Sequence, residues 1–376
     1  MAAPVRRTLS ALALAGVVLG AVACSPPAPQ TSAAAKSAAS ATDVAAFGGM
    51  DALIAAAKAE GTLNVVALPP DWTNYGEVIS SFQTKYGIKV ASAQPDASSA
   101  EEITAAQQLK GQDTAPDVFD LGQSVAVANV DKFAPYQVST YKDIPTALKS
   151  SDGKWVNDYG GYMSIGYDAA KVPAPTSVAD LLKPEYKGKV ALNGDPTQAG
   201  AAFSGVMMTS LGNGGSADDV AKGVDFFRQL KAAGNFLPLD PTNATIESGQ
   251  TPVVIDWDYL NTGEGKKLTG TKQWKTVVPA NAVVGGYYAQ AINASGPHPA
   301  AARLWEEFLY SDQGQNLWLK GGARPVRADA MQKAGTLDKT LYAALPAVSG
   351  TPVLLTPAQT DKAAATLNST WAKAIG

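Results

Sequence analysis

The stretch LNVVALPPDWTNYGEVISSFQTKYGIKVA, residues 63–91, decides the fold class of this chain. Its apolar start, Leu63 to Leu68, stops at two prolines and predicts a buried strand. Apolar residues at helical spacing follow: Val78, Ile79, Phe82 and Tyr86. Gly87 ends this helix, and Ile88 to Ala91 is the next predicted strand. A strand, a helix and a second strand in this order indicate a parallel α/β sheet with a crossover helix.

The same alternation continues on both sides of this stretch. Met50 to Ala57 predicts a helix that stops at Gly61, Ser99 and Glu102 predict a capping box, and Val118 to Leu121 predicts a strand. A second unit follows the segment Tyr159 to Tyr162. Its predicted strands lie at 189–192, 253–256, 277–278 and 287–292, and the chain closes with helices at 300–310, 313–320 and 359–375. Two α/β lobes are therefore expected.

Polar and aromatic residues follow the predicted strands at four places. These segments are 69–75, 120–124, 193–198 and 256–259. Because ligands of open α/β sheets bind beyond the carboxyl ends of the strands, we expect the four segments to line one cleft between the lobes.

The N-terminus has the pattern of an export signal. Arg6 and Arg7 precede an apolar run from Leu9 to Ala23, and Cys24, the only cysteine, follows small residues. This run is too short for a membrane span and predicts a signal peptide over residues 1–23. It resembles a bacterial lipoprotein signal, which predicts a lipid on Cys24; an ordinary signal peptide with an incidental cysteine is the alternative. The Ser, Ala, Pro and Thr that follow predict a flexible tether over residues 24–46.

Composition excludes several classes of function. The net charge of −3 argues against a nucleic-acid partner. His298 is the only histidine and stands between two prolines, and no Gly-x-Ser-x-Gly motif occurs. With Cys24 lipidated, the body has no thiol for a disulfide or a metal site. We therefore expect a protein that is not an enzyme, binds no metal and needs no cofactor.

Three segments resemble the bacterial polyamine-binding proteins. They are Asp71-Trp72-Thr73-Asn74-Tyr75 with the helix and strand after it, the run from Val178 to Lys189, and the run from Ala301 to Gln315. The broader group binds polyamines, ferric iron, thiamine or phosphonates and delivers them to ABC importers. The resemblance implies a two-lobed periplasmic-binding-protein-like fold of type II, in which each lobe is a mixed sheet flanked by helices. The ligand cleft would lie between the lobes, which close around it on a hinge.

The resemblance also implies roles for individual residues. Trp72, Tyr75 and Trp257 would be the rings that sandwich an alkylammonium chain, which fits the attraction of a ring face for a cation. Asp195 would bind an amine, and Gln123 and Ser124 would touch the ligand from the first lobe.

Two departures from the family pattern weaken the choice of a polyamine. Gln198 stands where a second acidic residue is expected. Tyr288 stands where a further carboxylate is expected, and Gly286 replaces an aromatic partner. Asp256 or Asp258 would compensate if one faces the cleft. A monoamine, a zwitterion or an uncharged polyol is thus as plausible as spermidine.

Each candidate also has a purely structural interpretation. Trp72 and Tyr75 could pack in the core, and Asp195 could cap a helix. The pair Tyr287-Tyr288 suggests ferric iron, but neighbouring strand residues point to opposite faces. Arg324 and Arg327 are interpreted as partners of surface salt bridges.

We predict a solute-binding protein with its first lobe over residues 47–158 and 289–329. The second lobe would comprise residues 159–288 and 330–376. The protein would be a monomer that captures a small polar, amine-bearing ligand and presents it to an ABC permease. The lipid would be its only contact with the membrane. We place it on the outer face of the bacterial cytoplasmic membrane. Alternatives are the same fold for a sugar, thiamine, phosphonate or ferric iron, a surface adhesion or sensor module, and a secreted hydrolase.

Overall fold

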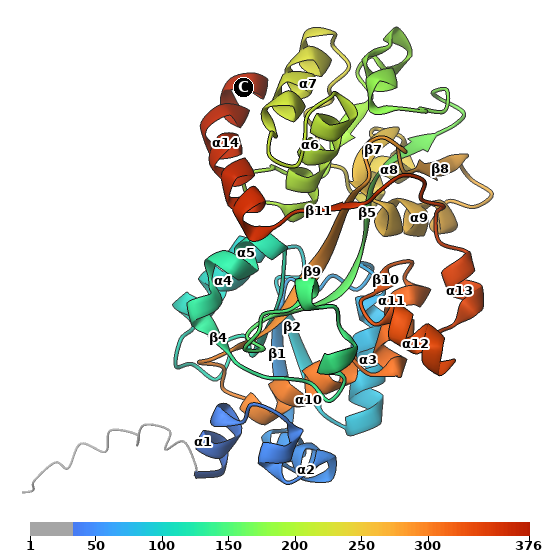
Figure 1. Cartoon of the computed structure of the whole chain (residues 1–376). Helices are drawn as coiled ribbons and strands as arrows, with labels where there is room; N and C mark the ends of the chain where they lie inside the picture. Colours follow the sequence, from blue (N-terminus) through green and yellow to red (C-terminus); the bar gives the residue numbers. More distant parts are fainter. Residues whose placement is uncertain (1–32) are drawn as a thin grey trace, which may run out of the picture. The chain divides into compact units, whose positions relative to one another are not determined.

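The computed structural model describes residues 33–376, so the predicted signal peptide and Cys24 lie outside the described residues. The elements form a mixed α/β structure in which two long strands run between a lower and an upper group of helices (Figure 1). None of the described helices is both long and apolar enough to cross a membrane. The lobe boundaries given above remain a prediction.

The opening stretch folds as its pattern predicts. Strand β1 (Thr62–Val66) pairs in parallel with β2 (Lys89–Ala93), and α3 (Tyr75–Tyr86) connects them. The helix buries one face, made of Tyr75, Val78, Phe82 and Tyr86. It ends at Gly87, whose φ of 69° is readily adopted only by glycine. The predicted parallel β–α–β unit is therefore confirmed.

The third strand does not continue the parallel pattern. Strand β3 (Val118–Leu121) pairs antiparallel with β9 (Val284–Asn293), and β4 (Phe133–Ala134) adds to the same strand. Strand β9 also runs antiparallel to β5 (Val156–Asp168), with a register shift between Asn157 and Gly160. Strands β3, β4, β5 and β9 thus belong to a mixed sheet of nine strands, which is separate from the two-stranded sheet of β1 and β2.

The far part of β5 carries the other half of the same nine-stranded sheet. Strand β7 (Val253–Trp257) and β8 (Trp274–Val277) pair antiparallel with β5, and β6 (Val190–Leu192) pairs in parallel with β7. Two short strands, β10 (Arg324–Pro325) and β11 (Val353–Leu354), join β5 and β9 respectively. Because β5 and β9 take part in pairing along their whole length, they are the structural connection between the two groups of helices (Figure 1).

The lower group of helices in Figure 1 covers the two-stranded sheet of β1 and β2 and the half of the nine-stranded sheet around β3. It contains α1 (Ala33–Ser40), α2 (Met50–Glu60), α3, α4 (Ser99–Gln108), α5 (Gln123–Ala128), α10 (Pro299–Leu309), α11 (Asp312–Lys320), α12 (Ala328–Ala334) and α13 (Lys339–Ala343). Its core packs Phe82 edge-on against Trp305, with ring centroids 5.1 Å apart. The capping box of α4 is made by Ser98 and Glu101, one residue before the predicted pair, so the helix begins one residue earlier than expected.

The upper group surrounds the half of the nine-stranded sheet around β7. It contains α6 (Gly200–Gly212), α7 (Ala221–Ala232), α8 (Asn243–Ser248), α9 (Asp258–Lys267) and the C-terminal helix α14 (Pro357–Ile375). Helix α14 packs on α7 through Trp371 and Phe227, whose rings are 5.1 Å apart. The chain reaches α14 from α13 through residues 344–356, which we call the C-terminal strap; it contains β11 and crosses from the lower to the upper group (Figure 1).

Part of the predicted tether is ordered on the body of the protein. Residues 33–40 form α1, residues 44–47 form a short 3-10 helix, and Ala38 and Ala41 are buried. The Arg303 guanidinium of α10 donates hydrogen bonds of 2.8 Å to the carbonyl oxygens of Ala39 and Ala41. The small side chains that suggested a tether let the backbone approach α10 closely, which a composition argument did not anticipate.

Candidate ligand cleft

Two adjoining cavities open between the loops that follow β1, β2, β6 and β7. Their volumes are about 260 and 350 Å³, and they share the wall residues Pro69, Trp72, Asp96, Asn193 and Pro241. Carboxylates dominate both walls: Asp71, Asp96, Glu101, Glu102, Asp120, Asp240, Asp256 and Glu264. Lys267 is the one basic residue on these walls. We call the two cavities together the acidic cleft.

Strained backbone lies in the loops of this cleft. Among the described residues, the non-glycine residues with positive φ are Ala67, Thr73, Asn74 and Gln94, which lie in the loops after β1 and β2. Such conformations cost free energy, and they cluster at binding and catalytic sites. The strain therefore supports a functional role for the two loops that carry Trp72 and Asp96.

Trp72 is held in place by a chain of hydrogen bonds. Its indole Nε1–H donates to the Tyr159 hydroxyl at 2.9 Å, and that hydroxyl donates to Asp120 Oδ2 at 2.6 Å. The Trp72 ring also meets Tyr288 and Tyr259 edge-on, at 5.5 and 6.3 Å between ring centroids. Half-buried and fixed on three sides, Trp72 is a preformed wall of the cleft.

Tyr75 was predicted to face the ligand together with Trp72, but it does not lie beside Trp72 on the cleft wall. It is fully buried, its ring packs edge-on against Trp318 at 4.8 Å, and its hydroxyl accepts a hydrogen bond of 3.1 Å from Gln290 Nε2. The structure thus places Tyr75 in the core beneath the cleft, where it supports Tyr159 and does not reach either cavity.

Asp256 lies on the cleft wall with its carboxylate directed by two donors. Asn193 Nδ2 donates to one oxygen at 2.8 Å and the Trp257 backbone N–H to the other, also at 2.8 Å. Burial outweighs these hydrogen bonds and raises the pKa of Asp256 to about 7. Burial likewise raises the pKa of Asp120, on the opposite wall, to about 7. Two cleft carboxyls therefore change charge near neutral pH.

Asp258 does not share this environment. It begins α9, is fully buried and pairs with Arg324 of β10, and it accepts a hydrogen bond of 3.0 Å from the Tyr162 backbone N–H. Arg327 pairs with Asp143 and Asp312 at 2.6 and 2.8 Å. Both arginines thus form the predicted salt bridges, but with side chains that are largely buried and not at the surface.

Asp195 and Gln198 are exposed and lie on neither wall of the acidic cleft. The Asp195 carboxylate accepts hydrogen bonds from the Thr197 backbone N–H at 2.8 Å and from its hydroxyl at 2.6 Å. It therefore stabilises a turn ahead of α6, which begins five residues later at Gly200.

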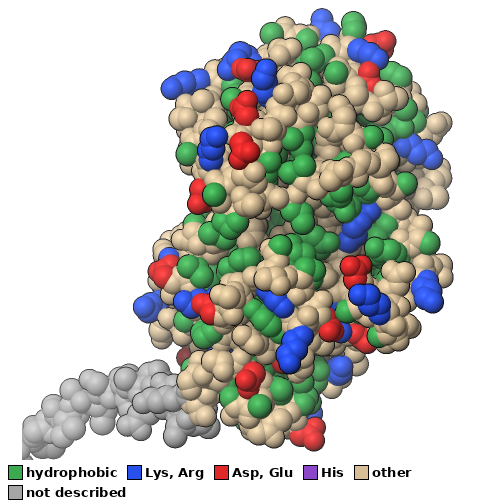
Figure 2. All heavy atoms as spheres, in the orientation of Figure 1, with side chains coloured by type: hydrophobic (Ala, Val, Ile, Leu, Met, Phe, Trp, Pro, Cys, Tyr) green, Lys and Arg blue, Asp and Glu red, His purple; other side chains and the backbone are tan. Residues whose placement is uncertain are grey.

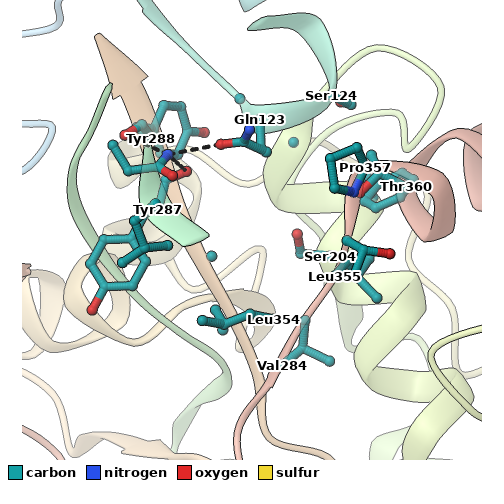
Figure 3. A pocket seen from close by; sticks show the side chains of 18 of the residues that line it. Gln123, Ser124, Ser204, Val284, Tyr287, Tyr288, Leu354, Leu355, Pro357 and Thr360 are labelled. Atoms are coloured by element: carbon teal, nitrogen blue, oxygen red, sulfur yellow. Dashed lines mark hydrogen bonds between the residues drawn. The ribbon is translucent and has the colours of Figure 1, made fainter. Parts of the chain in front are cut away.

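A further cavity of about 270 Å³ lies beyond Tyr288 and Gly200, two residues that it shares with the acidic cleft. Its walls come from α5, α6, β9, the C-terminal strap and the start of α14. Gln123, Ser124 and Tyr288 lie here (Figure 3). Trp257 also lines this cavity, and none of its wall residues is charged. The face drawn in Figure 2 is hollowed between the two groups of helices, with hydrophobic side chains around the hollow. We call this cavity the uncharged chamber.

The two predicted indole walls do not face each other. Trp257 lines the uncharged chamber and stacks on Tyr259 at 6.0 Å, and Tyr259 in turn meets Trp72 on the cleft side. A Cβ at Gly286 would lie 2.4 Å from Cη2 of Trp257. Gly286 therefore makes room for the Trp257 ring.

Sequence reasoning placed Tyr259 in a segment expected to line the cleft but gave this ring no role of its own. Tyr259 lines the cleft with its hydroxyl buried and without a hydrogen-bond partner, and burial raises its pKa well above the usual value. Tyr159, stacked on Tyr288 at 5.6 Å, was likewise given no role. The available signal was the two-residue step from Trp257 to Tyr259 at the end of a predicted strand.

The fold and the cleft match a known class of proteins. Residues 120–346 match the family described as bacterial extracellular solute-binding protein, and because this is more than half of the chain, the protein belongs to that family. A Fe(3+)-binding periplasmic protein of Serratia marcescens is 25% identical over 226 residues, which are 55% of this chain. The chain spans only 62% of the length of that relative.

Solved structures agree on the fold. Iron-bound HitA from Pseudomonas aeruginosa superposes with a TM-score of 0.64 at 20% identity, over 83% of this chain and 99% of that one. A periplasmic thiamin binding protein superposes with a TM-score of 0.67 at 15% identity, over 84% of this chain and 96% of that one. AgtB from A. tumefacien R10, in complex with agropinic acid, superposes with a TM-score of 0.66 at 14% identity, over 84% of this chain and 98% of that one. The chain therefore has the predicted type II periplasmic-binding-protein fold.

Proposed function

We propose that this protein is the solute-binding component of an ABC importer and that its solute is a small amine-bearing cation, the class that includes polyamines. Closure of two lobes on a hinge made by β5 and β9 would trap the solute for delivery to a membrane permease. The observation that carries the proposal is the charge of the cleft: eight wall carboxylates against Lys267 alone.

The cleft charges favour a cation for an electrostatic reason. Burial raises the pKa of Glu102, Asp120, Asp240, Asp256 and Glu264, which shows that ionising these carboxyls in the apo cleft is costly. A bound ammonium stabilises the ionised form of each and offsets that cost. A phosphonate or another anion would raise it further. The Trp72 ring supplies the aromatic surface on which an ammonium is held.

A thermal-shift panel tests the proposal directly. Polyamines, monoamines and thiamine should raise the melting temperature, whereas sugars and phosphonates should not. Trp72→Ala and Asp256→Asn should lose the shift, and Asp51→Asn on the exposed face of α2 is the matched control that keeps it. A shift produced by an anion and by no cation would overturn the proposed solute class.

Proton release gives a second, independent readout. A cation beside Asp256 lowers a pKa that burial raises to about 7, so the carboxyl must lose its proton on binding at pH 6 to 7. Calorimetric titration in two buffers of different ionisation enthalpy should therefore report net proton release. Binding should also strengthen between pH 6 and pH 8. Binding heats that are identical in both buffers would contradict a contact with Asp256.

Ferric iron is the second candidate because the Serratia marcescens relative is named for it and because the Tyr259 hydroxyl is buried and unpartnered on the cleft wall. Tyrosinate ligation is disfavoured here, since burial raises the pKa of both Tyr259 and Tyr288. Titration with ferric citrate decides the matter. A visible charge-transfer band that Tyr259→Phe abolishes would favour iron over an amine.

We also propose that Cys24 carries a lipid that holds a monomeric protein on the outer face of the cytoplasmic membrane. Its support is the signal-like sequence before Cys24. Intact mass spectrometry of membrane-extracted protein should show an acylated N-terminus at Cys24. Cys24→Ser should release the protein into the soluble fraction; retention on the membrane would refute the anchor.

A further inference from the structure

The solute site continues past the acidic cleft into a space of opposite character. Tyr288 and Gly200 line both the cleft and the uncharged chamber, so the two spaces meet at these residues. The cleft walls carry eight carboxylates and one lysine, and the chamber walls carry no charged side chain. A solute that reaches from one space into the other therefore meets two different chemistries.

Two glycines, Gly122 and Gly200, lie where the acidic cleft and the uncharged chamber adjoin. A Cβ on Gly122, at the start of α5, would lie 3.6 Å from Cα of Gly200, at the start of α6. A Cβ on Gly200 would lie 3.8 Å from the Tyr288 hydroxyl. The backbones of Gly122 and Gly200 thus approach closely beside the Tyr288 hydroxyl, where the cleft and the chamber adjoin.

The chamber suits an uncharged ring or hydrocarbon group. Phe203, Trp155 and Trp257 supply aromatic surface. Val284 and the strap residues Leu354 and Leu355 supply aliphatic surface (Figure 3). A charged group moved here from water would lose its hydration without an ionic partner, which is costly. The indole N–H of Trp257 is buried without a hydrogen-bond partner, so one acceptor on the solute would be satisfied there.

The C-terminal strap supplies part of the chamber wall. Strand β11 pairs Val353 with Val284 of β9 and so seats residues 354–357 on the chamber. The family match ends at residue 346, before the wall-forming part of the strap. Leu354 is 44% exposed at the chamber wall, where a bound apolar group would cover it.

We propose that the solute is an amphipathic cation, with its ammonium in the acidic cleft and an uncharged aryl or alkyl body in the chamber. This rests on the proposed function, which assigns the ammonium to the cleft. A polyamine with charges at both ends would leave one ammonium either outside the chamber or desolvated within it. The chamber therefore selects against such solutes and selects for a single charged end.

Calorimetry with four probes tests the proposal: 2-phenylethylamine, ethylamine, putrescine and 2-phenylethanol. We expect 2-phenylethylamine to bind at least about tenfold more tightly than ethylamine or putrescine, a difference of one order of magnitude in Kd. Leu354→Asp should abolish this advantage and leave ethylamine unchanged. Val130→Asp, at a similarly exposed apolar residue away from the cavity walls, is its control.

A second variant guards against misfolding of the first. Ser204→Phe on α6 should fill the chamber and weaken 2-phenylethylamine alone, and Ser204→Ala should not. Equal affinities for the three amines, unaffected by either variant, would overturn the chamber assignment but leave the cationic cleft standing. Binding of 2-phenylethanol as tight as that of 2-phenylethylamine would overturn the cationic cleft itself, as would the failure of every amine to bind.

Discussion

At the scale of single residues, Gly286 determines where the Trp257 ring lies. Alanine at this position would put a Cβ 2.4 Å from the ring, in a strand that pairs on both sides. We expect Gly286→Ala to lower the free energy of unfolding by roughly 1–3 kcal/mol, the usual cost of overpacking. Urea denaturation followed by tryptophan fluorescence measures this change.

The control for Gly286→Ala is Gly263→Ala in helix α9. A Cβ at Gly263 meets nothing within 4 Å, and its φ is ordinary. Helix propensity alone should then make this variant neutral or more stable by up to about 1 kcal/mol. If both variants lost stability equally, the Trp257 contact would not be the cause.

Asp256 gives the stability a pH dependence of defined sign. Its folded pKa is raised to about 7, above the unfolded value, so the folded state holds an extra proton between about pH 4 and pH 7. The stability contributed by this group is fully present below about pH 4 and is lost as the pH rises through 7. Asp256→Asn should reduce the slope by about 1.4 kcal/mol per pH unit in this window. Urea unfolding of both proteins across the pH range checks the slope.

Asp120 behaves in the same way as Asp256 and serves as the comparison. Its pKa is also raised to about 7, but its carboxylate accepts the Tyr159 hydroxyl that positions Trp72. Asp120→Asn should reduce the pH slope similarly and in addition disturb the wall of the cleft. An unchanged slope in Asp256→Asn would show that Asp256 is ionised throughout the range.

At the scale of elements, α1 is attached to the body by the Arg303 side chain and by the packing of Ala38 and Ala41. Arg303 is buried in α10 and donates to carbonyl oxygens of residues 39 and 41, and it also stands over the Tyr136 ring at 5.6 Å. Arg303→Lys cannot reproduce the fork of donors. We expect amide hydrogen exchange to accelerate over residues 37–47 and to stay unchanged in α14.

The control for this prediction is Arg228→Lys in α7. Arg228 is exposed and pairs only with Asp225 one turn away, so exchange over residues 37–47 should match the wild type. Protection of α1 that survives in Arg303→Lys would mean that packing of Ala38 and Ala41 suffices to hold it.

The elements differ in how far the sequence predicts them. Helix α3 has a strongly periodic face, so both it and the flanking parallel strands are predictable. The pairing of β3 with β9 joins residues about 170 apart and leaves no local signal. Residues 33–46 look like a tether because their attachment depends on Arg303, far away in the sequence. Local patterns thus reveal elements, and long-range partners decide their arrangement.

The candidate site shows the same limit. Trp72 and Asp256 were expected on the cleft from their positions at strand ends, and both line it. Tyr75 turns into the core because it stands on the buried face of α3. Tyr259 lies between Trp257 and Trp72. This arrangement, and the side of β7 that carries Trp257, depend on packing that no motif encodes.

At the scale of the whole molecule, a small latch joins the two sides of the cleft. Asp71, in the loop after β1, pairs with Lys267 of α9 at 3.2 Å and accepts a hydrogen bond from Asn243 of α8. Both partners of the ion pair are partly exposed, so the pair contributes at most about 1 kcal/mol. Lys267→Ala should shift the equilibrium toward an open form by up to about fivefold.

Small-angle scattering with and without ligand measures this shift as a larger apo radius of gyration. Lys266→Ala, exposed on the same turn of α9, is the matched control. An unchanged radius in Lys267→Ala would assign closure to the aromatic contacts of Trp72 instead.

The polypeptide passes between the two groups of helices in β5, again in β9 and a last time in the strap. Neither group is continuous in sequence, so neither can be completed by the ribosome before the final segments emerge. Long-separated pairings of this kind fold slowly. A nascent chain of this design stays pliable until late in its synthesis.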